Sequence, residues 1–333
     1  MESLSIDLAP QKLQKSSQLS GITSGMTPRH RKIDWDGEKK KSWRILVCGN
    51  KIVVGWDNGQ IKIYNSKDLR CETALSYRDG ERGVTGLQCT CKEILAGHND
   101  GSIFVWNIEK GTLVQKFSVM DTNSGYEYVN CMRWRDPKLV VGTIMQRVKI
   151  WQSVSSSFTL LDSWKMPDRF IDDLDFNQDC IFLLQHYFHT PDMRSKSVHI
   201  MNFNGRCLRS ITLPQFIMCM SPAEDYFVTA ADDNRGLRIW EMSTGVCVGE
   251  LEGHEDDVSA AYVQDGVIAS ADCSGRVIIW SAQAAREGKL AELARFTDST
   301  LRTGHWSPLK LGHSFVVTNS HNHDTITITD FLS

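Results

Sequence analysis

The chain has 333 residues, of which 41% are hydrophobic and 9% aromatic, the composition of a soluble globular protein. Its 37 lysines and arginines against 40 aspartates and glutamates give a formal charge of −3, which argues against a protein that binds nucleic acid through charge. The N-terminus lacks a secretory signal pattern and no apolar run of about 18 residues is present, so we expect an intracellular protein of the cytoplasm or nucleus that makes no membrane contact.

Ten cysteines are scattered along the chain, mostly within apolar runs. A chain of this length can build a hydrophobic core without disulfide cross-links. We therefore expect buried thiols in a reducing compartment and no disulfide framework.

The N-terminal segment differs in composition from the rest of the chain. Residues 1–28 are rich in serine, glutamine and lysine and contain few aromatic residues, which predicts a disordered tail. Residues 29–333 read as one all-β domain.

One short pattern recurs through that domain: alternating aliphatic residues, then a large side chain in most copies, then a polar residue. The copies read IKIYN, IFVWN, VKIWQ, VHIMN, LRIWE, VIIWS and ITITD. Their fourth residues, here called the anchors, are Tyr64, Trp106, Trp151, Met201, Trp240, Trp280 and Thr329. Successive anchors are 42, 45, 50, 39, 40 and 49 residues apart, and this spacing is typical of a four-stranded propeller blade.

Turn and strand signals surround each anchor. An apolar run and a tight turn precede it, as in Lys51 to Val54 before Asp57-Asn58-Gly59, and another short apolar strand usually follows. Four strands per period, repeated seven times, predict a seven-bladed β-propeller. The seventh repeat stops after its third strand, so a strand near residues 31–35 is expected to complete the last blade.

With these repeats the chain resembles the WD-repeat β-propellers. In that family a His, a strand Ser or Thr and a turn Asp form hydrogen bonds with the anchor Trp. The sixth repeat has His254, Ser270 and Trp280, with Ser274 where the family has its turn Asp. Most repeats lack such a set, so we expect their blades to depend on apolar packing and the anchor tryptophans to be core residues.

The third and fourth repeats depart furthest from the pattern. Met145 and a long insertion around residues 182–196 replace their usual turns. Looser strand pairing is expected in these two blades.

No catalytic motif with convincing spacing is present, so we expect neither enzyme activity, cofactor nor metal. The densest imidazole group is His321-Asn322-His323-Asp324, with His305 and His313 upstream. A metal-dependent enzyme on a propeller frame, with its metal near these histidines, is therefore an alternative.

A propeller binds partners through its exposed loops. The loops entering each blade and the turns between its two middle strands should share one face, called here the top face. Aromatic and arginine side chains on that face suit a protein or peptide interface. The candidate partner-binding residues are Arg82, Tyr126, Tyr128, Arg169, Arg194, Phe216, Arg235 and Arg302.

The C-terminal stretch from Leu309 to Leu332, which contains SHNHDTITITDFL, resembles the last blade of F-box/WD-repeat substrate receptors of cullin-type ubiquitin ligases. That resemblance implies a substrate-receptor-like component and a ubiquitin-ligase adaptor as partner. Residues 1–42, however, lack the apolar periodicity of an F-box. The broader prediction is a non-catalytic scaffold or adaptor that binds protein partners, and a further alternative is a structural subunit of an RNA or trafficking assembly.

Overall fold

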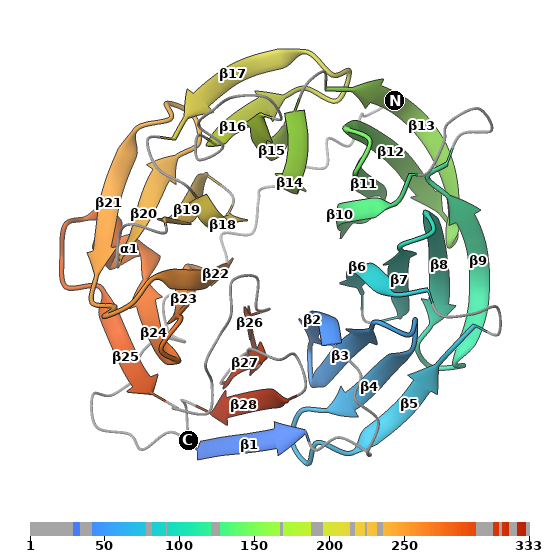
Figure 1. Ribbon diagram of the computed structural model, residues 1–333, viewed down its shortest axis with the longest axis horizontal. Helices are drawn as coiled ribbons and strands as arrows, with labels where there is room; N and C mark the ends of the chain where they lie inside the picture. Colours follow the sequence, from blue (N-terminus) through green and yellow to red (C-terminus); the bar gives the residue numbers. More distant parts are fainter. Residues whose placement is uncertain are drawn as a thin grey trace, which may run out of the picture.

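A computed structural model describes residues 29–33, 42–77, 82–90, 92–120, 127–166, 169–187, 196–213, 217–223, 225–231, 236–297, 309–312, 315–319 and 325–330. The predicted tail, residues 1–28, lies outside these ranges. The described strands form seven four-stranded antiparallel sheets arranged as blades around a central axis (Figure 1). The chain is thus a seven-bladed β-propeller, as its repeats predict.

Each of the first six blades runs from an innermost to an outermost strand in chain order. Blades 1 to 3 consist of β2 (Ser42–Cys48), β3 (Lys51–Trp56), β4 (Ile61–Asn65) and β5 (Cys71–Leu75); β6 (Val84–Cys89), β7 (Glu93–His98), β8 (Ser102–Asn107) and β9 (Thr112–Ser118); and β10 (Val129–Arg135), β11 (Lys138–Thr143), β12 (Arg147–Val154) and β13 (Ser157–Lys165).

Blades 4 to 6 repeat this order. They consist of β14 (Arg169–Phe176), β15 (Ile181–Tyr187), β16 (Lys196–Met201) and β17 (Cys207–Thr212); β18 (Ile217–Pro222), β19 (Tyr226–Ala231), β20 (Gly236–Glu241) and β21 (Cys247–Glu252); and β22 (Val258–Gln264), β23 (Val267–Asp272), β24 (Arg276–Ser281) and β25 (Glu292–Thr297). A short helix, α1 (Ala282–Arg286), follows β24, with the Ser281 side chain accepting a hydrogen bond from the amide of Ala284.

The seventh blade joins the two ends of the domain. It contains β26 (Leu309–Leu311), β27 (Phe315–Asn319) and β28 (Ile326–Asp330), and β1 (Arg29–Ile33) pairs antiparallel with β28 as the outermost strand. Arg31 donates to both carboxylate oxygens of Asp330 and also to the carbonyls of Ser66 and Lys67 in blade 1. Strand β1 therefore completes the last blade and is tied to the first.

The hydrophobic core lies between the blades. Seven clusters of buried side chains each combine residues of two neighbouring blades, including one cluster shared by blades 7 and 1. The anchors are buried, with Trp106, Trp151, Trp240 and Trp280 between 2% and 8% exposed. In blades 1 to 6 the outermost strand has a register shift beside the anchor.

Two expectations about this fold are wrong. Strand pairing is not looser in blades 3 and 4, since β12 and β13 keep eight paired positions and β14 and β15 keep seven. Most described cysteines are not buried either. Cys131 is buried, whereas Cys71 and Cys207 are exposed, because outermost strands have a solvent-facing side.

Candidate functional site

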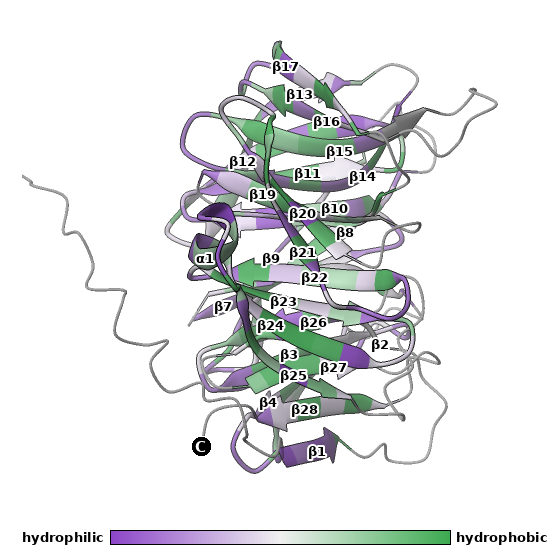
Figure 2. Ribbon diagram, turned by 90° about the vertical axis from the view of Figure 1, so that its left-hand side faces the viewer, coloured by the Kyte–Doolittle hydropathy of each residue, from purple (hydrophilic) through white to green (hydrophobic). Residues whose placement is uncertain are grey.

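Backbone hydrogen bonds identify the two faces of the propeller. On one face, residues after the second strand of a blade donate to the loop that enters that blade: Asn99 to Gly83 (3.1 Å), Ile144 to Tyr128 (3.2 Å) and Cys273 to Asp257 (2.9 Å). This is the top face. On the bottom face the connections after the third strands donate to the inner hairpin turns, as between Ser66 and Asn50 and between Ala282 and Gly266. Figure 2 shows the molecule from the side, with α1 projecting from one of these faces.

Arg82 lies on the top face in the loop entering blade 2. Its guanidinium contacts a carboxylate oxygen of Asp100 at 2.5 Å, and its carbonyl contacts Nδ1 of the buried His98 at 2.8 Å. The Arg82 side chain remains 36% exposed. Asp100 also accepts from the amide of Ser102 at 3.1 Å, so a loop and a turn together hold the Arg82 side chain in place.

Glu127 has a corresponding place in blade 3. Its fully buried carboxylate accepts from the Thr143 hydroxyl at 2.6 Å and lies 4.0 Å from Arg147 Nε. Tyr128 follows in the same loop and is half-buried. The carboxylate thus links the loop that carries Tyr128 to the turn that carries Arg147.

Arg169, at the start of β14, contacts the buried imidazole of His199 in the same blade. The pKa of His199 is lowered to about 4, chiefly by burial and also by the nearby Arg169 guanidinium. His199 is therefore neutral near pH 7 and accepts a hydrogen bond from Arg169. This contact fixes Arg169 at the top of blade 4.

Blade 6 contains the His, Ser, Asp and Trp side chains expected of the family, but the Asp stands at a different residue from the one expected. Trp280 Nε1 donates to Ser270 Oγ (2.8 Å), His254 Nε2 contacts the same oxygen (2.7 Å), and His254 Nδ1 contacts Asp272 (3.0 Å). Asp272, two residues before Ser274, supplies the carboxylate, and Ser274 donates to it. Blade 5 keeps a smaller version, in which Trp240 donates to Thr229 at 2.8 Å.

The other predicted partner-binding residues, Tyr126, Arg194, Phe216, Arg235 and Arg302, lie outside the described residues, as do His305, His313, His321 and His323. Of the eight partner-binding candidates, the structure thus places Arg82, Tyr128 and Arg169, each at the top of a different blade. Within the described residues, no group of three His, Cys, Asp or Glu side chains could hold a metal ion. The same part of the chain has no helix long and apolar enough to cross a bilayer.

A second feature, which the sequence interpretation missed, is a ring of side chains around the central channel. Each blade contributes one residue from its innermost strand. This residue pairs with an equivalent position of the second strand in every blade. These residues, called here the channel ring, are Leu46, Gln88, Arg133, Asp175, Ser221, Tyr262 and Lys310. All seven line one cavity of about 380 Å³.

Most polar members of the channel ring contact the next blade. Gln88 Oε1 accepts from the amide of Trp134 (3.2 Å), and Ser221 Oγ accepts from the amide of Val263 (2.9 Å). Tyr262 places its ring 4.0 Å from Lys310 Nζ, a cation–π distance. The ring therefore joins neighbouring blades at their inner edges.

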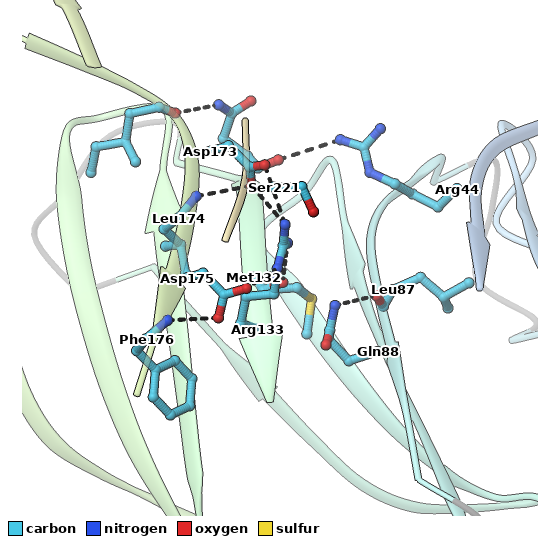
Figure 3. A network of polar contacts seen from close by, with 12 residues as sticks. Arg44, Leu87, Gln88, Met132, Arg133, Asp173, Leu174, Asp175, Phe176 and Ser221 are labelled. Atoms are coloured by element: carbon cyan, nitrogen blue, oxygen red, sulfur yellow. Dashed lines mark hydrogen bonds and ion pairs between the residues drawn. The ribbon is translucent and has the colours of Figure 1, made fainter. Parts of the chain in front are cut away.

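The strongest of these contacts connects blades 3 and 4. Arg133 donates to both carboxylate oxygens of Asp173, at 3.0 and 3.2 Å, and its Nε lies 3.4 Å from Asp175. Arg135 also contacts Asp175. Figure 3 shows Arg133 beside the two carboxylates, with Arg44 coming from blade 1. The two carboxylates raise the pKa of Arg133 despite its burial, so Arg133 stays charged.

Lys310 is placed differently. Its pKa is lowered to about 7, chiefly by burial and also by Arg133, while Asp173 and Asp175 oppose the shift. No carboxylate among the described residues forms an ion pair with Lys310, which has the face of Tyr262 as its cationic contact.

Comparisons with known proteins agree with this geometry. The model of the WD40 repeated domain matches residues 24–161, and that of the WD domain, G-beta repeat, matches residues 245–281. With these matches and its seven blades, the chain is a WD-repeat β-propeller protein.

Curated relatives are distant. SIR4-interacting protein SIF2 of Saccharomyces cerevisiae is 20% identical over 81% of this chain and 49% of its own length. Cilia- and flagella-associated protein 52 of Mus musculus is 21% identical over 70% of this chain and 37% of its own. Mitochondrial division protein 1 of Aspergillus clavatus is 37% identical over 18% of this chain and 9% of its own. The chain thus spans at most about half the length of these relatives.

Among solved structures, the computationally designed Ika8 protein superposes with a TM-score of 0.61 at 16% identity, over 89% of this chain and 98% of that one. At this identity the likeness shows the fold alone.

Proposed function

We propose that this chain is a non-catalytic protein-interaction scaffold or adaptor that binds a partner through its top face. The observation that carries the proposal is the way arginines of this face are held: Arg82 by Asp100, Arg169 by His199, and Arg147 near the buried Glu127. Arginine is frequent among the residues that dominate binding energy, and holding it in place before binding lowers the entropy lost on association.

The remaining predicted residues extend this proposed interface. Tyr126, Phe216 and Arg302 precede the innermost strands of blades 3, 5 and 7, while Arg194 and Arg235 stand between the two middle strands of blades 4 and 5. These are the loop classes whose described members form the top face. A partner segment lying across the face would meet aromatic and arginine side chains from several blades.

Affinity purification of the tagged chain from its own cells, with mass spectrometry, tests the proposal. A variant with Arg82→Ala and Arg302→Ala should recover specific partners at least tenfold less. Arg286→Ala is the matched control, because Arg286 pairs with Asp225 at 2.9 Å on the bottom face. Equal loss in both variants, or no specific partner with the unaltered chain, would contradict the proposal. Melting temperatures of all three proteins show whether a loss reflects unfolding.

A narrower form of the proposal makes the chain a substrate-receptor-like component of a cullin-type ubiquitin ligase. It is supported by the resemblance of residues 309–332 to the last blade of such receptors. The same purification tests it, because an adaptor and a cullin should be recovered with the unaltered chain. A stable, stoichiometric complex that lacks both would instead favour a structural subunit of a larger assembly.

A further inference from the structure

The channel cavity has an uneven distribution of charge. It is lined by four cationic side chains, Arg44, Arg133, Arg135 and Lys310, and by three acidic ones, Asp172, Asp173 and Asp175. With all of them ionised, one positive charge is in excess. The acidic side chains all come from β14, in blade 4, and the contacts of Arg133 and Arg135 with them lie on that side of the channel.

Lys310 is on β26 of blade 7, and Asp173 and Asp175 stabilise its charge electrostatically without forming a direct ion pair with it. It is half-buried, its Nζ lies 4.0 Å from the centre of the Tyr262 ring, and no carboxylate in the described part of the chain pairs with it. An ammonium group drawn out of water without a directly paired carboxylate is costly, since an aromatic face replaces only part of the lost hydration. Its lowered pKa has the same physical origin. A single negative charge entering the cavity would balance the excess and pair with this group.

The cavity that Lys310 lines has room for an oxyanion of modest size. Ser221, two blades away from Lys310, also lines the cavity; its Oγ accepts the Val263 amide hydrogen, and its hydroxyl can also act as a donor. The cavity extends along the inner strands from Asn130 and Asp172, near the top face, to Arg135. A volume of about 380 Å³ admits one side chain with water but no folded element.

We propose that the blade-7 side of the channel is a subsite for one carboxylate, supplied by an aspartate or glutamate side chain of a partner segment that enters from the top face. This inference rests on the proposed function, since the partner is the one held on that face. The carboxylate pairs with Lys310. A phosphate dianion fits less well, because only one positive charge is in excess and Asp172 and Asp173 would repel the second negative charge.

The test uses the full chain and four small probes: N-acetyl-glutamate amide, its neutral counterpart N-acetyl-glutamine amide, acetate and inorganic phosphate. Binding is followed by NMR of protein labelled with ¹³C at lysine Cε, which also reports the protonation of Lys310. The glutamate probe should bind saturably and raise the pKa of Lys310 by about one unit, equivalent to about tenfold preference for the protonated form. The glutamine probe should leave the pKa unchanged.

Three variants identify the group responsible. Lys310→Met should weaken glutamate binding at least tenfold, and Lys310→Arg should retain it because the charge is kept. Lys138→Met is the matched control, because Lys138 lies 3.8 Å over the Phe203 ring, a comparable cation–π contact, and does not line the cavity.

Several outcomes would overturn the inference. Equal effects of the glutamine and glutamate probes, or glutamate binding that survives Lys310→Met, exclude a carboxylate subsite. If acetate binds but the glutamate probe does not, the site is one for a small free carboxylate. If phosphate binds more tightly than the glutamate probe, the site is one for a phosphate group. If the probes fail while Arg82→Ala with Arg302→Ala still abolishes partner capture, the subsite fails and the proposed function stands.

Discussion

Arg31 and Asp330 form a bidentate ion pair across the seam of the propeller, with Nε–Oδ2 and Nη2–Oδ1 distances of 2.8 and 2.7 Å. Arg31 comes from β1 and Asp330 from β28, so the pair joins segments 299 residues apart in the sequence. The same guanidinium donates to the carbonyls of Ser66 and Lys67. One side chain thus connects two strands of blade 7 with the turn after β4 of blade 1, at the point where the ring closes.

Substitution Arg31→Met should lower the free energy of unfolding by about 2 kcal/mol, because a half-buried bidentate pair and two further hydrogen bonds are lost. Lys32→Met is the control, since Lys32 lies on the same strand and is exposed. Urea denaturation of the three proteins measures the difference. An equal effect of both substitutions would show that the seam does not depend on Arg31.

In blade 6, Ser270→Ala should cost more stability than Thr229→Ala in blade 5. Ser270 Oγ is hydrogen-bonded to both Trp280 and His254, whereas the described contact of Thr229 Oγ1 is with Trp240 alone. A buried polar group left without its partner costs about 1–3 kcal/mol, so the expected losses are about 3 kcal/mol and about 1–2 kcal/mol. The midpoints of urea denaturation, compared between variants whose transitions have the same slope, test which substitution costs more stability. Equal losses for the two variants would refute the prediction.

His199 should make the propeller less stable in mild acid. Its pKa of about 4 in the folded state lies below the value near 6.5 of an unfolded histidine, so the unfolded state binds more protons between these values. The free energy of unfolding therefore falls as the pH drops from about 6.5 towards 4, by on the order of 2 kcal/mol from this residue. His199→Gln should flatten that part of the stability–pH curve, and a slope that stays the same in this variant would contradict the expectation.

Cys48 should be the most reactive of the half-buried thiols with resolved pKa shifts. A hydrogen bond from the Cys89 thiol lowers its pKa to about 7, with Lys51 assisting and burial opposing, whereas burial raises the pKa of Cys180 and Cys273. Iodoacetamide labelling followed by peptide mass spectrometry should give a midpoint near pH 7 at Cys48. Cys89→Ala should move that midpoint up, and an unchanged midpoint would rule out this cause.

The fold could be predicted because its signal repeats. An anchor recurs seven times, and each copy combines an apolar strand with a turn, so errors in one repeat do not alter the overall count. The sequence prediction fails where a side chain expected at one residue is supplied by a neighbouring residue. Asp272 supplies the carboxylate expected at residue 274, because it ends the strand before the same turn and contacts His254, while Ser274 donates to it.

The candidate site was harder to predict. Arg82 and Arg169 were expected to face a partner, and their contacts with Asp100 and His199 depend on which loop packs on which turn. The channel ring did leave a signal, since six of its members precede their anchors by 18 or 19 residues. Asp175 precedes its anchor by 26 residues because of the insertion in blade 4. The spacing between these residues and their anchors does not predict the charge balance around Lys310, because that balance depends on side chains from several blades that meet in the channel.

Closure of the ring by β1 also constrains the order of events during synthesis. Strand β1 is made about 300 residues before β28, its partner, so it must wait while six blades emerge. Each of these blades can pair its own strands as it appears, since their contacts are local in sequence. Blade 7 therefore closes last, and until then the apolar surfaces of blades 1 and 6 that pack against it remain exposed to solvent.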